Sequence, residues 1–199
     1  MATLPAHTLE GIIIRAHPSG ESDLVLRIIC RDEGKISAMA KHARTSKRRY
    51  GSRLDLFDRG SFELKKGRGS LLLVDKFSPA PAFRNLRDDL ARLTIASVIC
   101  ESFDYLLLEG AGDGDDVFSL LNSGLEALDQ TRTLKESLRA CHTVLGNLLT
   151  LAGFLDPAQQ PEPSAKNLFR LLQHLETCSE KELQSKASLI QLVESLRAT

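Results

Sequence analysis

Seven basic residues and no acidic residue lie between Gly34 and Leu54. Lysine and arginine side chains neutralise phosphates and release counterions, so such a cluster favours salt-sensitive, sequence-independent binding to nucleic acid. The stretch also contains one aromatic residue, Tyr50, and two roles are open for its ring: stacking on a base, or packing under its own loop. The candidate DNA-binding residues are Lys35, Lys41, Arg44, Lys47, Arg48, Arg49, Tyr50 and Arg53.

Two other interpretations of this basic stretch stay open. It is either a solvated loop without a partner, or the surface through which a non-enzymatic scaffold protein docks an acidic protein. Arg15 and Arg27 lie in predicted strands, where each can extend a basic surface or form a structural ion pair. The charge pattern alone does not choose between these interpretations.

The sequence contains no pattern typical of an active site. The glycine pairs Gly67–Gly69 and Gly110–Gly112 lack the third glycine and the strand–helix context of a dinucleotide site. A nuclease would need acidic metal ligands that converge, and Asp23, Asp55 and Asp58 are the set that could supply them. Because no spacing supports that set, the protein is expected not to be an enzyme.

The cysteines and histidines do not have the spacing of metal ligands. The four cysteines are Cys30, Cys100, Cys141 and Cys178. They form no CxxC pair, and each lies in an apolar pattern, which predicts small buried side chains rather than a zinc site or a disulfide framework. The five histidines are scattered along the chain. The sequence therefore predicts neither a metal nor another cofactor.

Charge is distributed unevenly along the chain. The formal net charge of the whole sequence is zero, which by itself argues against nucleic-acid binding. Residues 1–79, however, carry 15 Lys and Arg against 9 Asp and Glu, whereas residues 80–199 carry 11 against 17. This asymmetry predicts different partners for the two parts, one of them polyanionic. Because the sequence has no long apolar run and no signal-peptide pattern, we expect a cytoplasmic protein that does not bind a membrane.

Short strands with turns between them are predicted in the first part of the chain. The predicted strands are Thr8–Ala16, Asp23–Arg31, Ile36–Ala40, Ser61–Lys65 and Ser70–Phe77. His17–Ser22 is predicted to be a turn, and Ser78–Phe83 a proline-rich joint. Five strands with a long insertion after the third are typical of the OB-fold, a small barrel that binds oligonucleotides. An SH3-like barrel is the structural alternative.

The rest of the chain is predicted to form about five helices, because leucines recur every three or four residues. Asn85 and Ser164 are expected to cap two of them, and Thr133–Glu136 and Ser179–Glu182 have the pattern of a capping box. The predicted fold class is therefore α+β. It comprises a basic, DNA-binding OB-fold barrel over residues 1–79 and an acidic, protein-binding helical bundle over residues 80–199.

Five segments together resemble the RecO family of recombination mediators in their order and spacing. They are Gly11–Arg15, Gly20–Leu26, Glu33–Arg44, Arg49–Phe57 and Leu86–Leu93. The resemblance is strong over residues 9–57 and extends to about Pro157. It implies an OB-fold followed by a helical domain, the layout that the strand and helix patterns also indicate.

The resemblance also implies a function and a set of partners. RecO proteins bind single- and double-stranded DNA, anneal complementary strands, and act in the bacterial cytosol, associated with the nucleoid during repair. With RecR they promote loading of RecA on DNA coated with single-stranded DNA-binding protein, whose C-terminal tail is an expected partner. Many members carry a four-cysteine zinc module after the position of Gly153, where this sequence has the cysteine-free segment Asp156–Pro163. The resemblance therefore implies no metal here.

Overall fold

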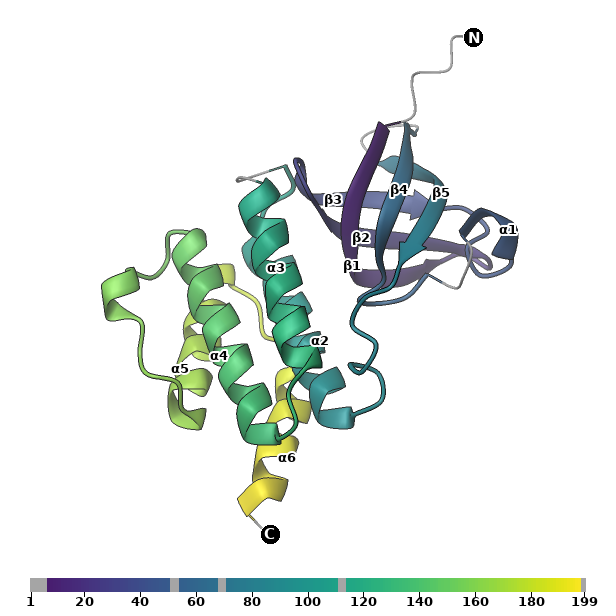
Figure 1. Ribbon diagram of the computed structural model, residues 1–199. Helices are drawn as coiled ribbons and strands as arrows, with labels where there is room; N and C mark the ends of the chain where they lie inside the picture. The colour runs from purple at the N-terminus through teal and green to yellow at the C-terminus, as the bar shows by residue number, and fades with distance from the viewer. Residues whose placement is uncertain (1–6, 51–53, 68–70, 111–113, 198–199) are drawn as a thin grey trace. The chain divides into compact units, whose positions relative to one another are not determined.

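The first part of the chain folds into a closed barrel of five strands (Figure 1). The computed structural model describes residues 7–50, 54–67, 71–110 and 114–197, without the side chains of residues 47, 48, 196 and 197. The strands are β1 (His7–Ser19), β2 (Asp23–Cys30), β3 (Gly34–Ala40), β4 (Arg59–Lys66) and β5 (Leu72–Ala80). A short helix, α1 (Lys47–Tyr50), lies between β3 and β4 in the sequence.

The long strand β1 closes the barrel, because its first half pairs with β4 and its second half with β2. The order around the barrel is β1-β2-β3-β5-β4. Neighbouring strands are antiparallel except β3 and β5, which run parallel where Ala38 and Met39 meet Leu72 and Leu73. A closed five-stranded barrel with this order is an OB-fold, so the predicted fold of this part is confirmed.

Two strands extend through prolines that were predicted to lie outside them. β1 continues to Ser19, with Pro18 opposite Leu24, and β5 continues to Ala80, with Pro79 opposite Gly60. The predicted turn at His17 and the predicted joint at Ser78 therefore begin too early. Proline is tolerated in these places because only one edge of the strand is paired there. Pro18 lies where β1 pairs with β2 alone, and Pro79 where β5 pairs with β4 alone, so the other edge needs no backbone N–H.

Contacts between residues divide the chain into two compact units. Unit 1 comprises Met1–Ala82 and Leu108–Ser119, and unit 2 comprises Phe83–Leu107 and Leu120–Thr199. The main helices are α2 (Leu90–Leu106), α3 (Gly114–Asp129), α4 (Leu134–Leu151), α5 (Ala165–Ser179) and α6 (Lys186–Arg197). The described residues 108–110 and 114–119 thus group with the barrel, although they were predicted to belong to the helical domain.

Helix α2 is the centre of unit 2, where it packs against α4, α5 and α6. Its buried side chains occupy most of its circumference and include Ile95, Ile99 and Phe103. Cys100 and Cys141 are buried, as is Cys30 in unit 1, and all three are free thiols whose pKa burial raises. The prediction that these cysteines act as small buried hydrophobes is confirmed, whereas Cys178 is half-buried.

The helix starts were predicted correctly where the cap is local in sequence. Thr133 accepts a hydrogen bond from the backbone N–H of Glu136 at 3.2 Å, and Ser164 accepts one from Asn167 at 3.1 Å. The cap predicted at Asn85 is wrong, because α2 begins later with Asp89 as its N-cap. Asn85 instead donates its backbone and side-chain N–H groups to the carboxylate of Asp129.

The capping box predicted at Ser179 is also wrong. Ser179 is the last residue of α5, and the chain then turns through Glu180, which adopts a left-handed conformation. α6 begins only at Lys186, and the two residues just before it are held by a side chain of another helix. The carboxylate of Glu101, in α2, accepts hydrogen bonds from the backbone N–H groups of Gln184 and Ser185 at 3.0 and 2.9 Å.

Candidate nucleic-acid interface

The basic segment, which we define as Lys41–Tyr50, follows directly after strand β3. Its chain reverses at His42, a non-glycine residue with a φ of 57°. The backbone N–H groups of Thr45 and Ser46 both donate to the His42 carbonyl, at 3.1 and 2.8 Å, which closes a tight turn before α1. The segment therefore has a defined backbone rather than the open loop that its polar composition suggests.

The turn between β1 and β2 fastens this segment to the barrel. The carboxylate of Asp23 accepts a hydrogen bond from the backbone N–H of His42 at 2.8 Å, and this bond lowers the pKa of Asp23. Arg44 donates its backbone N–H to the Ser22 carbonyl at 3.0 Å and its guanidinium to the Glu21 carbonyl at 3.2 Å. In OB-folds the β1–β2 loop is one of the loops that bind oligonucleotides. The basic segment thus lies beside that loop.

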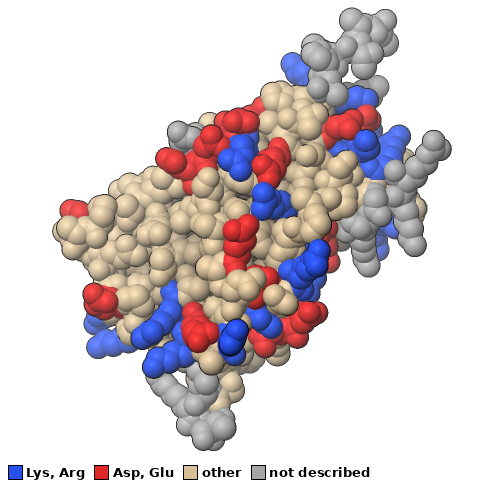
Figure 2. Space-filling model, viewed as in Figure 1, with Lys and Arg blue, Asp and Glu red and all other residues tan. Residues whose placement is uncertain are grey.

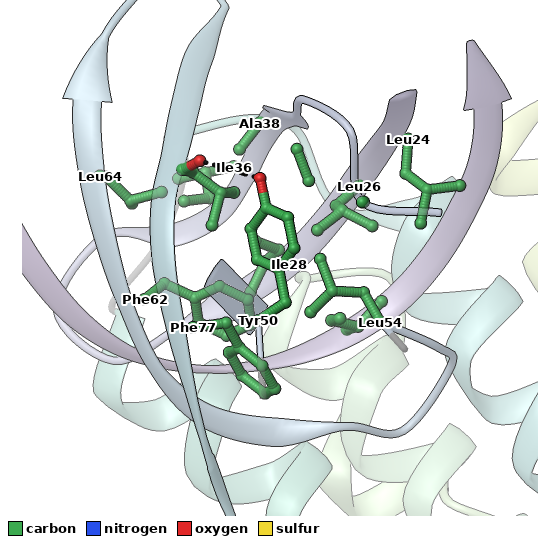
Figure 3. Packing of buried hydrophobic residues seen from close by; sticks show 14 of the residues in the cluster. Leu24, Leu26, Ile28, Ile36, Ala38, Tyr50, Leu54, Phe62, Leu64 and Phe77 are labelled. Carbon is green, nitrogen blue, oxygen red and sulfur yellow. Dashed lines mark hydrogen bonds between the residues drawn. The ribbon is translucent and has the colours of Figure 1, made fainter. Parts of the chain in front are cut away.

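Tyr50 secures the other end of the segment from inside the barrel. Its side chain is fully buried, and Figure 3 shows the ring in the barrel interior with Ile28, Phe62 and Phe77. Its hydroxyl donates to the backbone carbonyl of Lys41 at 2.9 Å, and burial raises the pKa of the phenol. The ring therefore packs under its own loop and is not accessible to a base, so base stacking is wrong for this conformation.

The predicted basic residues separate into three groups. Lys41, Arg44 and Arg49 are exposed on the basic segment. Lys35 is buried in strand β3, with 5% of its surface exposed, and so offers a phosphate backbone almost no accessible surface. The side chains of Lys47 and Arg48, and all of Arg53, lie outside the described residues.

Several cations elsewhere on the described part of the barrel are paired with acids. Glu10 binds the guanidinium groups of Arg31 and Arg59 at 3.1 and 2.7 Å, and Lys65 pairs with Asp75 at 2.7 Å. Partial burial raises the pKa of Glu10, but the hydrogen bonds from the two arginines outweigh this effect and the net pKa is lowered. Figure 2 shows basic and acidic side chains interspersed over the face it presents. The acid-free sequence of the basic segment is the exception to this pattern.

The outer face of β1, β2 and β3 carries a second group of polar side chains. Strand pairing places Arg15 opposite Arg27, and Arg27 opposite Ser37. Arg27 forms an ion pair with Glu109 at 3.3 Å, so for this arginine the structural ion pair is present. Sequence reasoning missed Ser37 and Glu109, because Glu109 is 72 residues from Ser37 and no local pattern connects them.

The acidic residues proposed for a nuclease do not form a metal site. Asp23 is bound to the backbone of His42, and Asp58 accepts a hydrogen bond from the backbone N–H of Asp55 at 2.9 Å. Among the residues that the structure describes, no three His, Cys, Asp or Glu side chains form a group that could hold a metal ion. Within the same residues, no helix is both long and apolar enough to cross a membrane.

Comparison with known proteins assigns the family. The model of the family described as "Recombination protein O N terminal" matches residues 1–81. The DNA repair protein RecO of Anaeromyxobacter sp. (strain K) is 38% identical over 133 residues, which cover 66% of this chain and 52% of that protein. The chain belongs to the RecO family. This confirms the resemblance found in the sequence.

Other RecO proteins are similar over comparable lengths. The DNA repair protein RecO of Desulfatibacillum aliphaticivorans is 30% identical over 154 residues, which cover 76% of this chain and 56% of that protein. The corresponding protein of Nocardioides sp. is 32% identical over 119 residues, which cover 60% and 49%. The chain therefore spans about half the length of the curated RecO relatives it matches. The family model covers the barrel and the basic segment.

Proposed function

We propose that this RecO-family chain is a non-enzymatic DNA repair mediator that binds single- and double-stranded DNA without sequence specificity. The observation that carries the proposal is the exposure of Lys41, Arg44 and Arg49 on a segment without acidic residues, fastened to a loop that OB-folds use for oligonucleotides. These cations contact phosphates, whose spacing and charge do not depend on the bases, so the binding carries no sequence information.

Annealing of complementary strands follows from the same electrostatics. Two strands repel each other through their phosphates, and a cationic surface that holds both screens that repulsion. In this proposal the protein then acts in the bacterial cytosol with a RecR-like protein to promote loading of RecA onto DNA coated with single-stranded DNA-binding protein. The repair role is supported by similar proteins from three bacteria, each of which is named DNA repair protein RecO.

A cavity in unit 2 suits the C-terminal tail of single-stranded DNA-binding protein. It measures about 470 Å³ and lies between α4 and the start of α5. Leu138, Pro163 and Ala165 make part of its lining apolar, while Lys135 and Arg139 contribute cations. An acidic peptide with an apolar end complements this combination.

We therefore expect Arg139→Glu to weaken binding of a labelled peptide with the sequence of that tail. Arg132→Glu, which changes an arginine outside the lining of this cavity, should leave the binding unchanged.

The DNA-binding proposal is tested by neutralising exposed cations in matched pairs. The test variant is Lys41→Gln with Arg49→Gln on the basic segment, and the control is Lys166→Gln with Arg170→Gln on α5. Both variants lose two positive charges. Fluorescence anisotropy with a labelled oligonucleotide at low salt should show about tenfold weaker binding for the test variant and little change for the control.

Two outcomes would contradict the proposal. Equal losses in both variants would mean that overall charge, not the basic segment, determines affinity. If wild-type protein does not bind DNA but captures an acidic protein through Lys41 and Arg49, the segment is the docking surface of a scaffold protein instead.

A further inference from the structure

Glu109 is held against the outer face of the barrel by its own backbone. The backbone N–H of Gly110 donates to the carbonyl of Lys35 at 3.0 Å, and Lys35 and Glu109 form an isolated parallel β-bridge beside β3. This tether places the carboxylate of Glu109 over the neighbouring strands, where it meets the guanidinium of Arg27 at 3.3 Å. The hydroxyl of Ser37 donates to the same carboxylate oxygen.

Arg27 and Ser37 together form a small anion-binding arrangement. They are direct cross-strand partners on β2 and β3, so one oxygen atom can accept hydrogen bonds from both. The two charged side chains stay accessible, since 38% of the Arg27 side chain and 52% of the Glu109 side chain are exposed. Exposed ion pairs of this kind contribute little to stability, so an incoming anion can replace the carboxylate at small cost.

The position of this arrangement suits a nucleic-acid strand. The outer face of β2 and β3 is the face on which OB-folds bind oligonucleotides. Along β2, Arg27 is four residues from Asp23, which holds the basic segment through His42. Four residues of a strand span about 13 Å, and this is the axial rise of roughly four nucleotides of one B-form strand. A short oligonucleotide can therefore contact both places.

We propose that Arg27 and Ser37 bind a phosphate of nucleic acid, and that the carboxylate of Glu109 occupies this position as an internal competitor until a strand displaces it. The proposal rests on DNA binding by unit 1, the function proposed above. Displacement exchanges one oxyanion for another at the same guanidinium and hydroxyl, while the tether through Gly110 and Lys35 stays intact. Arg27 is thus both the residue that binds the phosphate and the residue whose charge Glu109 neutralises before the strand arrives.

The test is a double-mutant cycle on Glu109 and Arg27, measured by anisotropy with a single-stranded oligonucleotide. Glu109→Gln removes the competing charge and should raise affinity roughly two- to fivefold, the range expected for release of one exposed ion pair. Arg27→Gln should lower affinity, and in the Arg27→Gln background the gain from Glu109→Gln should disappear. The matched control is Glu63→Gln, which removes the same charge from a pair with Lys76 on β4 and β5.

The cycle separates competition at one site from a general change of charge. If Glu109→Gln raises affinity equally with and without Arg27, or if Glu63→Gln raises it as much, Glu109 acts through the net charge and the proposal is overturned. A urea titration of each variant checks that the fold is retained. Salt-sensitive DNA binding that depends on Lys41 and Arg49 but not on Glu109 would leave the proposed function standing and overturn this inference. If neither wild type nor Glu109→Gln binds DNA, both fail.

Discussion

The phenol of Tyr50 joins the basic segment to the barrel core. Its ring is buried among apolar side chains and its hydroxyl binds the Lys41 carbonyl, nine residues earlier in the chain. A role of this kind affects stability, whereas base stacking would affect DNA affinity alone. Substitution of this residue therefore distinguishes the two roles that the sequence left open.

We expect Tyr50→Phe to lower the free energy of unfolding by about 0.5–1.5 kcal/mol, because the variant keeps the ring but loses the hydrogen bond to Lys41. Tyr50→Ala should cost about 3–5 kcal/mol, since it also leaves a cavity in the core. Urea denaturation followed by circular dichroism measures both. A Tyr50→Ala variant of unchanged stability and weaker DNA binding would instead support a stacking role.

His142 is a second residue whose environment makes a measurable prediction. It is buried in α4, and within the described part of the chain neither of its ring nitrogens has a hydrogen-bond partner. Burial lowers the pKa of this imidazole, although the charge of Glu162 acts in the opposite direction. Because the unfolded chain then binds a proton more readily than the folded protein, stability should fall as the pH drops.

For wild type we expect His142 not to reduce the free energy of unfolding above the ordinary histidine pKa of about 6.5. Below that pH the free energy of unfolding should decline as the pH falls toward the lowered pKa of His142. His142→Leu cannot be protonated, so its stability should change less between pH 7 and pH 5. Urea titrations at several pH values give both curves. Parallel curves for wild type and His142→Leu would show that His142 does not titrate differently on folding.

At the scale of the elements, the start of α6 depends on a residue from another helix. Glu101 accepts backbone hydrogen bonds from Gln184 and Ser185, and the Ser185 hydroxyl also binds it. Burial raises the pKa of Glu101, but these hydrogen bonds outweigh it, so the carboxylate is kept ionised. A carboxylate near a helix N-terminus satisfies backbone donors that would otherwise have no partner.

We expect Glu101→Ala to destabilise the protein by about 1.5–3 kcal/mol, the usual contribution of hydrogen bonds to a charged group, and to speed amide hydrogen exchange at the start of α6. Glu182→Ala is the matched control, because Glu182 is exposed and belongs to the capping box predicted from the sequence. Chemical denaturation and exchange measurements compare the two. A larger effect of Glu182→Ala would mean that the local box, not Glu101, starts the helix.

The elements show what local sequence can and cannot reveal. Thr133 and Ser164 were identified as caps because donor and acceptor are three residues apart, so the pattern itself contains both partners. Glu101 and Ser185 are separated by 84 residues, and no window of sequence contains both. The alternation of apolar residues predicted the strands, but not their continuation through Pro18 and Pro79, since that depends on which strand edges are paired.

At the scale of the whole molecule, unit 1 is not continuous in sequence, because residues 108–110 and 114–119 pack with the barrel. Gly114 begins α3 at a close approach to the β2–β3 turn. A Cβ atom there would lie 2.6 Å from the backbone carbon of Asp32 and from the backbone nitrogen of Gly34. Arg31 reinforces the contact through an ion pair with Asp115 at 3.2 Å.

We expect Gly114→Ala to destabilise the protein by about 1–3 kcal/mol, because rigid backbone must move to accommodate the methyl group. Gly146→Ala is the matched control, since the atoms nearest its Cβ belong to the side chain of Gln160, which can rotate away. Thermal or urea unfolding compares the two. If both variants have wild-type stability, the start of α3 does not dock against the β2–β3 turn as described.

The sequence predicted the positive charge of the candidate site, but not which of its side chains are buried or which residues they contact. The acid-free run of cations is visible in the sequence, and it led to Lys41, Arg44 and Arg49, which are exposed. The burial of Lys35 and Tyr50 was not predictable, because it depends on how β3 and the barrel core close around them. The contact of Arg27 with Glu109 depends on a backbone tether across the chain and has no local signature.

The central claim is that the basic segment binds DNA through phosphates, and the salt dependence of single-stranded DNA binding tests it most directly. The measurement compares wild type with a variant in which Lys47, Arg48 and Arg49 are replaced by glutamine. Phosphate contacts predict a steep fall of wild-type affinity with salt, and a logarithmic slope that is smaller by about 2 in the variant, since each contact to a single strand contributes roughly 0.7. Equal slopes for the two proteins, or wild-type affinity that does not change with salt, would contradict the claim.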